Sequence, residues 1–250
     1  MKQIDEQAGA WTKAFESGKF VRKSSEFRDS IEVDGTFDVE SDRYHLYISH
    51  ACPWAHRTLI TRAILGLEKH ITVDVVDWRM NPNGSWSFNP DEEGATADTI
   101  NGEDSLEGIY NRAFDGWSAS GNIGTVPVLW DKKHETIVNN ESSEIIRMLD
   151  TLAQSGLGNG ATLCPAQLKQ DIEAMIDANY EAVNNGVYKS GFARTQSAYD
   201  EAVTALFARL DELEAHLEGR EWLVGDGKGQ LTEADICLFP TLVRFDLVYV

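Results

Sequence analysis

The feature that most constrains this chain is a cysteine that lies between a short apolar strand and a helical repeat. Residues 45–49 (HLYIS) are typical of a strand, and Cys52-Pro53 follows after a short turn. Apolar residues then recur at three- and four-residue spacing over 55–67, which indicates a helix with one buried face. A second apolar run at 71–76 predicts another strand. These segments predict a β-α-β unit with Cys52 at the entrance of its helix.

This position favours ionisation of the Cys52 sulfur. Proline is tolerated in the first helical turn, because its missing N–H would have no intrahelical partner there. Backbone N–H groups and the positive end of the helix dipole both favour a thiolate, which is the reactive form. Most cysteines without a disulfide are small buried hydrophobes, but the strand–Cys–Pro–helix order favours a nucleophile. Ala55 stands where a dithiol motif has its second sulfur, so disulfide chemistry needs an outside thiol, for which glutathione is the obvious candidate.

Composition narrows the class of protein. A length of 250 residues allows one large domain or two smaller ones. The net charge of −19 argues against binding to nucleic acid or to an anionic membrane. No apolar stretch approaches the roughly 20 residues that span a bilayer, and the first residues lack the apolar core of a signal peptide. Three cysteines are too few for a disulfide scaffold, so we expect a reducing cytoplasm and predict no metal site.

The chain divides into an arm and two domains. The arm keeps five aromatic residues, more than a solvated tail usually retains, so we expect it to lie on the body of the protein. A Gly-rich linker follows the first domain over 153–164, and helical spacing of apolar residues begins beyond it. The predicted boundaries are 1–40 for the arm, 41–152 for the first domain and 165–250 for an all-helical second domain.

The second domain is predicted to contain helices at 166–185 and 199–217. Thr232 and Asp235 form a Thr-x-x-Asp capping box that opens a further helix. We interpret Cys164 and Cys237 as structural residues.

Two further segments of the first domain have recognisable local patterns. Residues 125–130 (TVPVLW) predict a strand entered through a Val-Pro bond, with 136–138 as its hairpin partner. Residues 139–144 (NNESSE) precede an apolar-periodic helix, and such a start is a common capping arrangement. The same helix N-terminus can hold a carboxylate, while the Glu141 carboxylate can hold an ammonium group.

The motifs HLYIS-x-x-CPWAHR, NGSW, TVPVLWDKK and NNESSEIIRML resemble those of the glutathionyl-hydroquinone reductases, the xi class of glutathione transferases. FVRKSSEFRDSI is similar to the N-terminal arm of that family, so the resemblance runs from about Phe20 to the last residue. It implies an α/β thioredoxin-like N-terminal domain plus an all-α C-terminal glutathione-transferase domain. Family members continue beyond Val250, so the second domain is expected to be truncated.

The resemblance also implies roles for individual residues. Val126 would precede a cis proline and pair with the cysteinyl backbone of glutathione, and Glu141 with Ser142 would bind its γ-glutamyl end. Two aromatic groups of the second domain would contact the quinol ring. A basic residue that the family usually has before TVPVLW is absent from 121–124 (GNIG). The full expected set is catalytic Cys52, Tyr188 and Tyr249, with Trp86, Val126, Glu141 and Ser142 binding glutathione.

The activity that the resemblance implies is glutathione-dependent reduction of glutathionyl-hydroquinones through a Cys52–glutathione mixed disulfide. Glutathione is then a co-substrate, glutathionyl-quinols are the other small-molecule partners, and the full-length protein is expected to be a homodimer. Two alternatives stay open: an omega-like thioltransferase or dehydroascorbate-type reductase, which uses the same cysteine, and a non-catalytic glutathione-binding protein. A conjugating transferase is disfavoured, because Cys52 would trap glutathione as a disulfide.

Overall fold

The computed structural model describes residues 15–22, 24–81 and 84–249, and the first 14 residues of the predicted arm lie outside them. The described residues form two compact units. The first contains Ser25–Ala161, and the second joins the described residues before Ser25 to the chain from Thr162 onward. The expected combination of a thioredoxin-like domain with a helical domain is confirmed by the elements that each unit contains.

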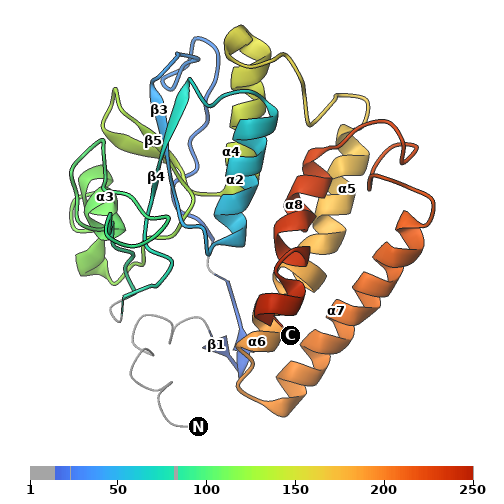
Figure 1. The fold of residues 1–250 in the computed structure, drawn as a ribbon. Helices are drawn as coiled ribbons and strands as arrows, with labels where there is room; N and C mark the ends of the chain where they lie inside the picture. Colours follow the sequence, from blue (N-terminus) through green and yellow to red (C-terminus); the bar gives the residue numbers. More distant parts are fainter. Residues whose placement is uncertain (1–14, 23, 82–83, 250) are drawn as a thin grey trace. The chain divides into compact units, whose positions relative to one another are not determined.

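A four-stranded mixed sheet forms the centre of the first unit, in the order β4-β3-β5-β6 (Figure 1). β3 runs parallel to β4, whereas β5 is antiparallel to both β3 and β6. Because parallel neighbours need a crossover connection, helix α2 links β3 to β4, and the predicted β-α-β unit is confirmed. The strands are β3 (Tyr44–Ile48), β4 (Ile71–Val75), β5 (Val128–Asp131) and β6 (Thr136–Asn139).

Helices cover both faces of this sheet. α2 (Pro53–Ile64) and α4 (Ser142–Leu152) lie together on one face, and α3 (Leu106–Ala113) lies on the other (Figure 1). All five residues of β3 are buried as a result, which explains why the strand is a continuous apolar run interrupted only by His45. Two short helical turns complete the unit, η2 (Ser118–Ser120) and η3 (Ala153–Leu157).

A buried ion pair fixes the far end of the hairpin. The Arg43 guanidinium donates hydrogen bonds to both carboxylate oxygens of Asp131, at 2.8 Å and 2.7 Å, and neither side chain is more than 2% exposed. Burial alone would raise the pKa of the Asp131 carboxyl, but hydrogen bonds from Arg43, the Lys133 amide and His134 lower it below the ordinary value of 3.8.

Part of the predicted arm extends the sheet beyond β6. Asp29 N donates to Val138 O at 3.0 Å, and Asn140 N donates to Phe27 O at 3.1 Å. This pairing covers the β6 edge of the sheet, which would otherwise expose unpaired backbone groups. It also brings the start of the first unit alongside the loop that leads into α4.

The long polar segment between β4 and α3 is tied down at several points. Isolated bridges join Met80 to Trp86 and Ser87 to Ser105, and Leu106 N donates to Trp86 O at 2.8 Å. Phe88 is 8% exposed and makes an edge contact with Tyr47 at 5.6 Å between ring centroids. Phe88 therefore anchors the segment to the sheet.

The second unit is helical apart from a small hairpin near its start. Its core combines residues from all the longer helices, including Ile172, Val183, Leu206, Leu213 and Leu238. The elements are β1 (Phe15–Glu16), β2 (Lys19–Phe20), α5 (Lys169–Asn179), η4 (Tyr180–Asn184), α6 (Gly186–Gly191), α7 (Gln196–Leu217), α8 (Glu233–Leu242) and η5 (Phe245–Tyr249).

Two details differ from the predicted helices. The single helix expected over 166–185 changes to a π-helical turn at η4, and the segment around Tyr188, which lies between the two expected helices, is helix α6. The turn coincides with buried Asn184, whose Nδ2 donates to Cys237 O at 3.1 Å and to Thr241 Oγ1 at 2.9 Å. A hydrogen-bonded anchor of this kind is set by tertiary contacts, which periodicity does not reveal.

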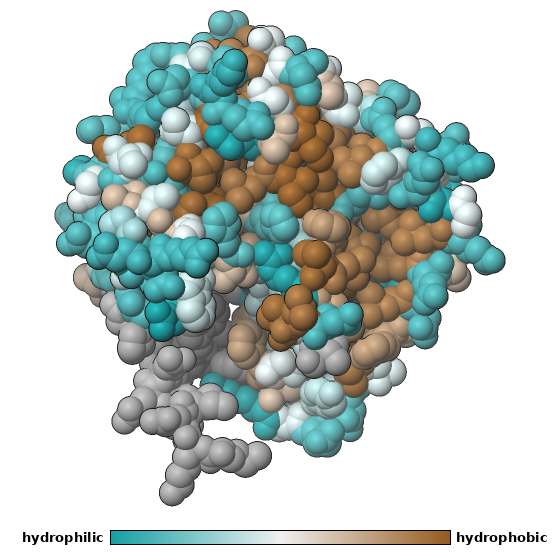
Figure 2. Space-filling view, in the orientation of Figure 1, coloured by the Kyte–Doolittle hydropathy of each residue, from teal (hydrophilic) through white to brown (hydrophobic). Residues whose placement is uncertain are grey.

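The predicted capping box is confirmed, because the Asp235 carboxylate accepts hydrogen bonds from Thr232 N and Oγ1 at the start of α8. Apolar side chains gather on the face shown in Figure 2. The segment from α8 to η5 contains the exposed apolar residues Phe239, Leu242, Val243, Leu247 and Val248. Within the described ranges, no helix combines the length and the apolar character needed to cross a membrane.

Candidate functional site

Cys52 lies at the predicted place, the N-cap of α2. Its backbone is extended (φ −86°, ψ 116°), and Pro53 starts the helix. The Sγ accepts the Ala55 N–H at 3.5 Å, so one of the unpaired amides of the first turn faces the sulfur. The residue is half-buried, and the three cysteines form no disulfide. Negative charge on this sulfur is stabilised by both the amide and the helix dipole.

Val126 faces the same sulfur from the start of the hairpin. The Val126–Pro127 peptide bond is cis, as the family resemblance predicts. The Cys52 thiol donates to Val126 O at 3.4 Å. The reactive group thus lies beside the backbone that leads into β5.

Glu141 is itself the N-cap of α4. Its carboxylate accepts hydrogen bonds from Ser143 N and Oγ, both at 3.3 Å, and from Ser25 Oγ at 3.1 Å. Ser142 is 2% exposed, and its hydroxyl donates to Glu141 at 3.4 Å. One carboxylate and the amides of a helix N-terminus are therefore concentrated at one point.

A buried arginine connects the two helices that carry these groups. Arg57, on α2, is 2% exposed, and its Nη1 donates to Ser142 Oγ at 3.4 Å. Its guanidinium also stacks over the Trp54 ring at 4.5 Å from the centroid. Arg57 thereby ties the helix that begins at Cys52 to the N-terminus of α4.

Trp86 is half-buried within the long segment after β4. Its backbone is held by the Met80 bridge and by the Leu106 amide. The indole role that the resemblance implies stays a prediction.

Tyr188 and Tyr249 lie together in the second unit, with ring centroids 6.1 Å apart. Phe20 of β2 stacks on Tyr188 at 6.2 Å, and the Arg22 guanidinium lies over the Tyr188 ring at 4.6 Å. Arg22 is oriented by Asn185, whose Oδ1 accepts its Nε–H at 2.8 Å. The two predicted phenols thus share one aromatic cluster that the first residues of the second unit help to build.

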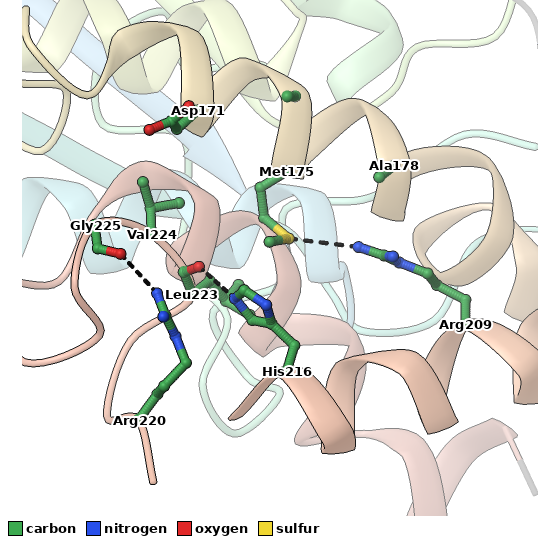
Figure 3. Close-up of a pocket in the computed structure, with 10 residues that line it drawn as sticks. Asp171, Met175, Ala178, Arg209, His216, Arg220, Leu223, Val224 and Gly225 are labelled. Carbon is green, nitrogen blue, oxygen red and sulfur yellow. Dashed lines mark hydrogen bonds between the residues drawn. The ribbon is translucent and has the colours of Figure 1, made fainter. Parts of the chain in front are cut away.

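A different pocket of about 380 Å³ lies in the second unit, between α5, α7 and the loop after α7 (Figure 3). Two of its polar side chains hold the loop in place, since His216 donates to Leu223 O at 2.7 Å and Arg220 donates to Gly225 O at 2.8 Å. Arg209 contacts the Met175 sulfur at 3.4 Å. In the described part of the chain, no three His, Cys, Asp or Glu side chains form a group that could hold a metal ion.

Sequence reasoning missed three residues that support the site: Ser25, Arg57 and Asn140. Ser25 and Asn140 meet only because the arm pairs with the end of β6, a contact between residues more than 100 positions apart. No local pattern signals such a contact. Arg57 carried no signal in the apolar spacing either, because it is buried with Thr58 and Thr61 on a polar face of α2, whereas Ala63 and Ile64 of the predicted apolar face are exposed.

Taken together, the first unit offers one thiol at a helix tip, the backbone of Val126 next to it and a carboxylate at a second helix tip. These groups suit a peptide-like ligand that carries a thiol, an extended backbone and an α-amino acid end. The thiol can attack a sulfur of that ligand, because a thiolate is the nucleophile in exchange reactions.

Comparison with known proteins identifies this arrangement. Residues 51–152 match the family model for the glutathione S-transferase N-terminal domain, and residues 196–250 match the one for the C-terminal domain. The glutathionyl-hydroquinone reductase PcpF of Sphingobium chlorophenolicum is 48% identical over 246 residues, which cover 96% of this chain and 75% of that protein.

Two solved structures agree. The xi glutathione transferase of Phanerochaete chrysosporium superposes with a TM-score of 0.86 at 49% identity, covering 93% of this chain and 73% of that one. The glutathione-bound structure of YqjG, a glutathione transferase homologue from Escherichia coli, gives a TM-score of 0.83 at 48% identity, covering 90% and 73%. The chain therefore belongs to the glutathione transferases, and within them to the xi class, the family of the glutathionyl-hydroquinone reductases.

Proposed function

We propose that this protein reduces glutathionyl-hydroquinones to hydroquinones at the expense of glutathione. The observation that carries the proposal is the single thiol of Cys52 at the tip of α2, held between the Ala55 amide and the Val126 carbonyl. This geometry supplies one reactive sulfur and no second cysteine at the position of Ala55. The resolving thiol must then come from the ligand.

The reaction balances in two exchanges. The Cys52 thiolate attacks the glutathione sulfur of the thioether, which forms a Cys52–glutathione disulfide and breaks the bond from sulfur to the aromatic ring. The ring carbon keeps the bonding electron pair and takes up a proton, giving the hydroquinone. A second glutathione, as thiolate, attacks the mixed disulfide, so oxidised glutathione leaves and the Cys52 thiolate is regenerated. The proton that glutathione loses on ionising matches the one that the ring gains.

Four residues of the first unit would position glutathione. Val126 pairs with the cysteinyl backbone as an added strand does. Glu141 accepts the ammonium group of the γ-glutamyl end, and the first amides of α4, with Ser142, hold its carboxylate. Trp86 lies over the tripeptide. The absence of a basic residue at 121–124 removes one contact that relatives could use.

The second unit would supply the quinol contacts. Tyr188 and Tyr249 donate hydrogen bonds to the quinol oxygens as negative charge develops on them. Their rings contact each other, with centroids 6.1 Å apart, so both hydroxyls belong to one aromatic cluster. In this proposal residues 41–152 hold glutathione and residues 165–250 hold the quinol. We also propose a reducing cytoplasm, which suits a thiol enzyme, and a homodimer as its setting.

The direct test uses a Cys52→Ser variant and a glutathionyl-hydroquinone substrate. Loss of turnover by at least about 1,000-fold is expected, because removal of a nucleophile removes the reaction path and not just a contact. Cys164→Ser, in the helical unit, serves as the matched control and should keep wild-type turnover. Full activity of Cys52→Ser would refute the mechanism.

A thioltransferase is the alternative within the same chemistry. Reduction of a glutathionyl disulfide without any reduction of a glutathionyl-hydroquinone would favour it. Binding of glutathione with turnover of neither substrate would instead indicate a non-catalytic binding protein.

A further inference from the structure

Tyr110 occupies a central place between the two segments proposed to bind glutathione. It belongs to α3, its side chain is fully buried, and its sequence position alone suggests an ordinary core residue. Its hydroxyl, however, contacts Thr125, the residue before Val126, and Asn140, the residue before Glu141. A single side chain thus bridges the immediate neighbours of two ligand contacts.

The hydrogen bonds of this hydroxyl are complete. It donates to Thr125 O at 2.8 Å and accepts from Thr125 N at 3.3 Å and from Asn140 Nδ2 at 2.9 Å. A phenol has one donor and two acceptor sites, so its capacity is fully used. Burial raises the pKa of Tyr110, so the proton that Thr125 O requires stays in place.

The ring that carries the hydroxyl is held just as firmly. It stacks on Trp117 at 4.9 Å between centroids and meets the edge of Phe27 at 5.7 Å. A Cβ at Gly124 would lie 2.8 Å from the Tyr110 ring, so the backbone of the Val126 segment passes directly over it. Little freedom remains for the ring to move independently of its neighbours.

Asn140 is fixed from its other side too. Its Oδ1 accepts from Phe27 N at 3.2 Å, so its Nδ2 is directed at Tyr110. The path from Val126 to Glu141 therefore runs through Thr125, the Tyr110 hydroxyl and Asn140, and hydrogen bonds join each of these groups to the next.

We propose that Tyr110 is a positioning residue for glutathione, whose hydroxyl sets the spacing between the Val126 backbone and the Glu141 carboxylate. The inference rests on the proposed function only in taking these two residues as glutathione contacts. The residue acts through its neighbours and does not touch the ligand. If Tyr110 sets this spacing, its hydroxyl affects the affinity of a ligand that reaches both contacts at once. It does not affect the affinity of a ligand that reaches only one of them.

The test compares two unreactive ligands on the Tyr110→Phe variant. S-methylglutathione reaches both contacts, whereas S-methyl-cysteinylglycine lacks the γ-glutamyl end and reaches only Val126. We expect the variant to bind S-methylglutathione about 3- to 10-fold more weakly, the equivalent of roughly one hydrogen bond. Its affinity for the shorter ligand should stay within about twofold, so the affinity ratio of the two ligands falls.

Tyr44→Phe is the matched control. Tyr44 is equally buried and also donates to a backbone carbonyl, Asp38 O at 2.6 Å, but it lies at the opposite end of β3 from Cys52. Both variants should lower the melting temperature, and only Tyr110→Phe should change the affinity ratio. An unchanged ratio in Tyr110→Phe, or an equal change in both variants, would overturn the proposal.

If Tyr110→Phe does not fold, Asn140→Ala removes the Nδ2 contact instead and must lower the same ratio. Turnover separates this inference from the proposed reaction. A wild-type protein that fails to reduce glutathionyl-hydroquinones, with the ratio still lowered in the variant, refutes the reaction and supports the spacing role. A wild-type protein that turns over, with the ratio unchanged in the variant, does the reverse.

Discussion

The Sγ of Cys52 lies 3.4 Å from the carbonyl oxygen of Val126 and 3.5 Å from the amide nitrogen of Ala55. These contacts act in opposite directions. The amide stabilises a thiolate, whereas the carbonyl accepts a hydrogen bond from a neutral thiol and would repel a negative sulfur. In the proposed complex the cysteinyl N–H of glutathione takes over the carbonyl, and the thiol loses its acceptor.

Ligand binding should therefore raise the fraction of Cys52 that is ionised at neutral pH. The probe is γ-glutamyl-alanyl-glycine, which has the backbone of glutathione and no thiol. Ultraviolet absorbance of the thiolate should increase when this peptide binds, because the Val126 carbonyl, which favours the neutral form, has been occupied. The Cys52→Ser variant gives the background. A signal that stays constant at saturating peptide would show that the Val126 carbonyl does not control the thiol.

Glu141→Gln should weaken glutathione binding while it leaves the fold intact. The amide oxygen of Gln can still accept from Ser143 N and cap α4. The negative charge that would face the γ-glutamyl ammonium in the proposed complex is lost. Hydrogen bonds to charged groups contribute about 1.5–3 kcal/mol, so the KM for glutathione should rise about 10- to 100-fold. The kcat at saturating glutathione should change little.

Glu144→Gln is the matched control for this prediction. Glu144 lies in the first turn of the same helix, but its carboxylate pairs with Arg28 and accepts from Asn139. Its substitution should lower the unfolding free energy and leave the KM near the wild-type value. If both variants raise the KM equally, the effect comes from the helix terminus as a whole and not from Glu141.

The sequence predicted the β-α-β unit and the position of Cys52 because both follow from local patterns. Apolar runs, helical spacing and the Cys-Pro step are readable within a window of about 15 residues. The hairpin of β5 and β6 and the capping box of α8 were predictable for the same reason, since Asp235 meets Thr232 only three residues away.

The features that the sequence did not reveal depend on distant contacts. Ser25 reaches Glu141 because the arm pairs beyond β6, and Tyr110 joins Thr125 to Asn140 across the fold. The π-helical turn at η4 coincides with the anchor that Asn184 makes to α8. In each case a side-chain hydrogen bond between remote segments fixes the local geometry, and such bonds leave no periodic signature.

Asp131→Asn should cost much of the stability of the first unit at neutral pH. The variant leaves the Arg43 guanidinium buried without its counter-charge, which typically costs about 3–5 kcal/mol of unfolding free energy. Because the folded-state pKa of Asp131 is lowered, the pair contributes fully above the ordinary value of 3.8 and loses its contribution as the pH falls through the folded-state value. Urea unfolding of both proteins should show the difference narrowing below about pH 4.

Asp42→Asn is the control for the acid experiment, since Asp42 pairs with Lys132 while its side chain is 69% exposed. Solvent screens that pair, so its removal should leave the unfolding free energy nearly unchanged at neutral pH. If the unfolding free energy of the wild type exceeds that of Asp131→Asn by the same amount in acid as at neutral pH, the variant disturbs packing and not charge.

Tyr188→Phe and Tyr249→Phe should each lower the kcat for glutathionyl-hydroquinone by about 100-fold, the usual loss for one donor to a developing oxyanion. The rings stay in place in both variants, because Tyr188 keeps its contacts with Phe20 and Arg22. Binding of S-methylglutathione should be unchanged, since that ligand lacks the quinol. Tyr199→Phe, at a half-exposed position of α7, should behave as wild type. Equal losses of kcat and of S-methylglutathione affinity would place these hydroxyls at the tripeptide instead of at the quinol.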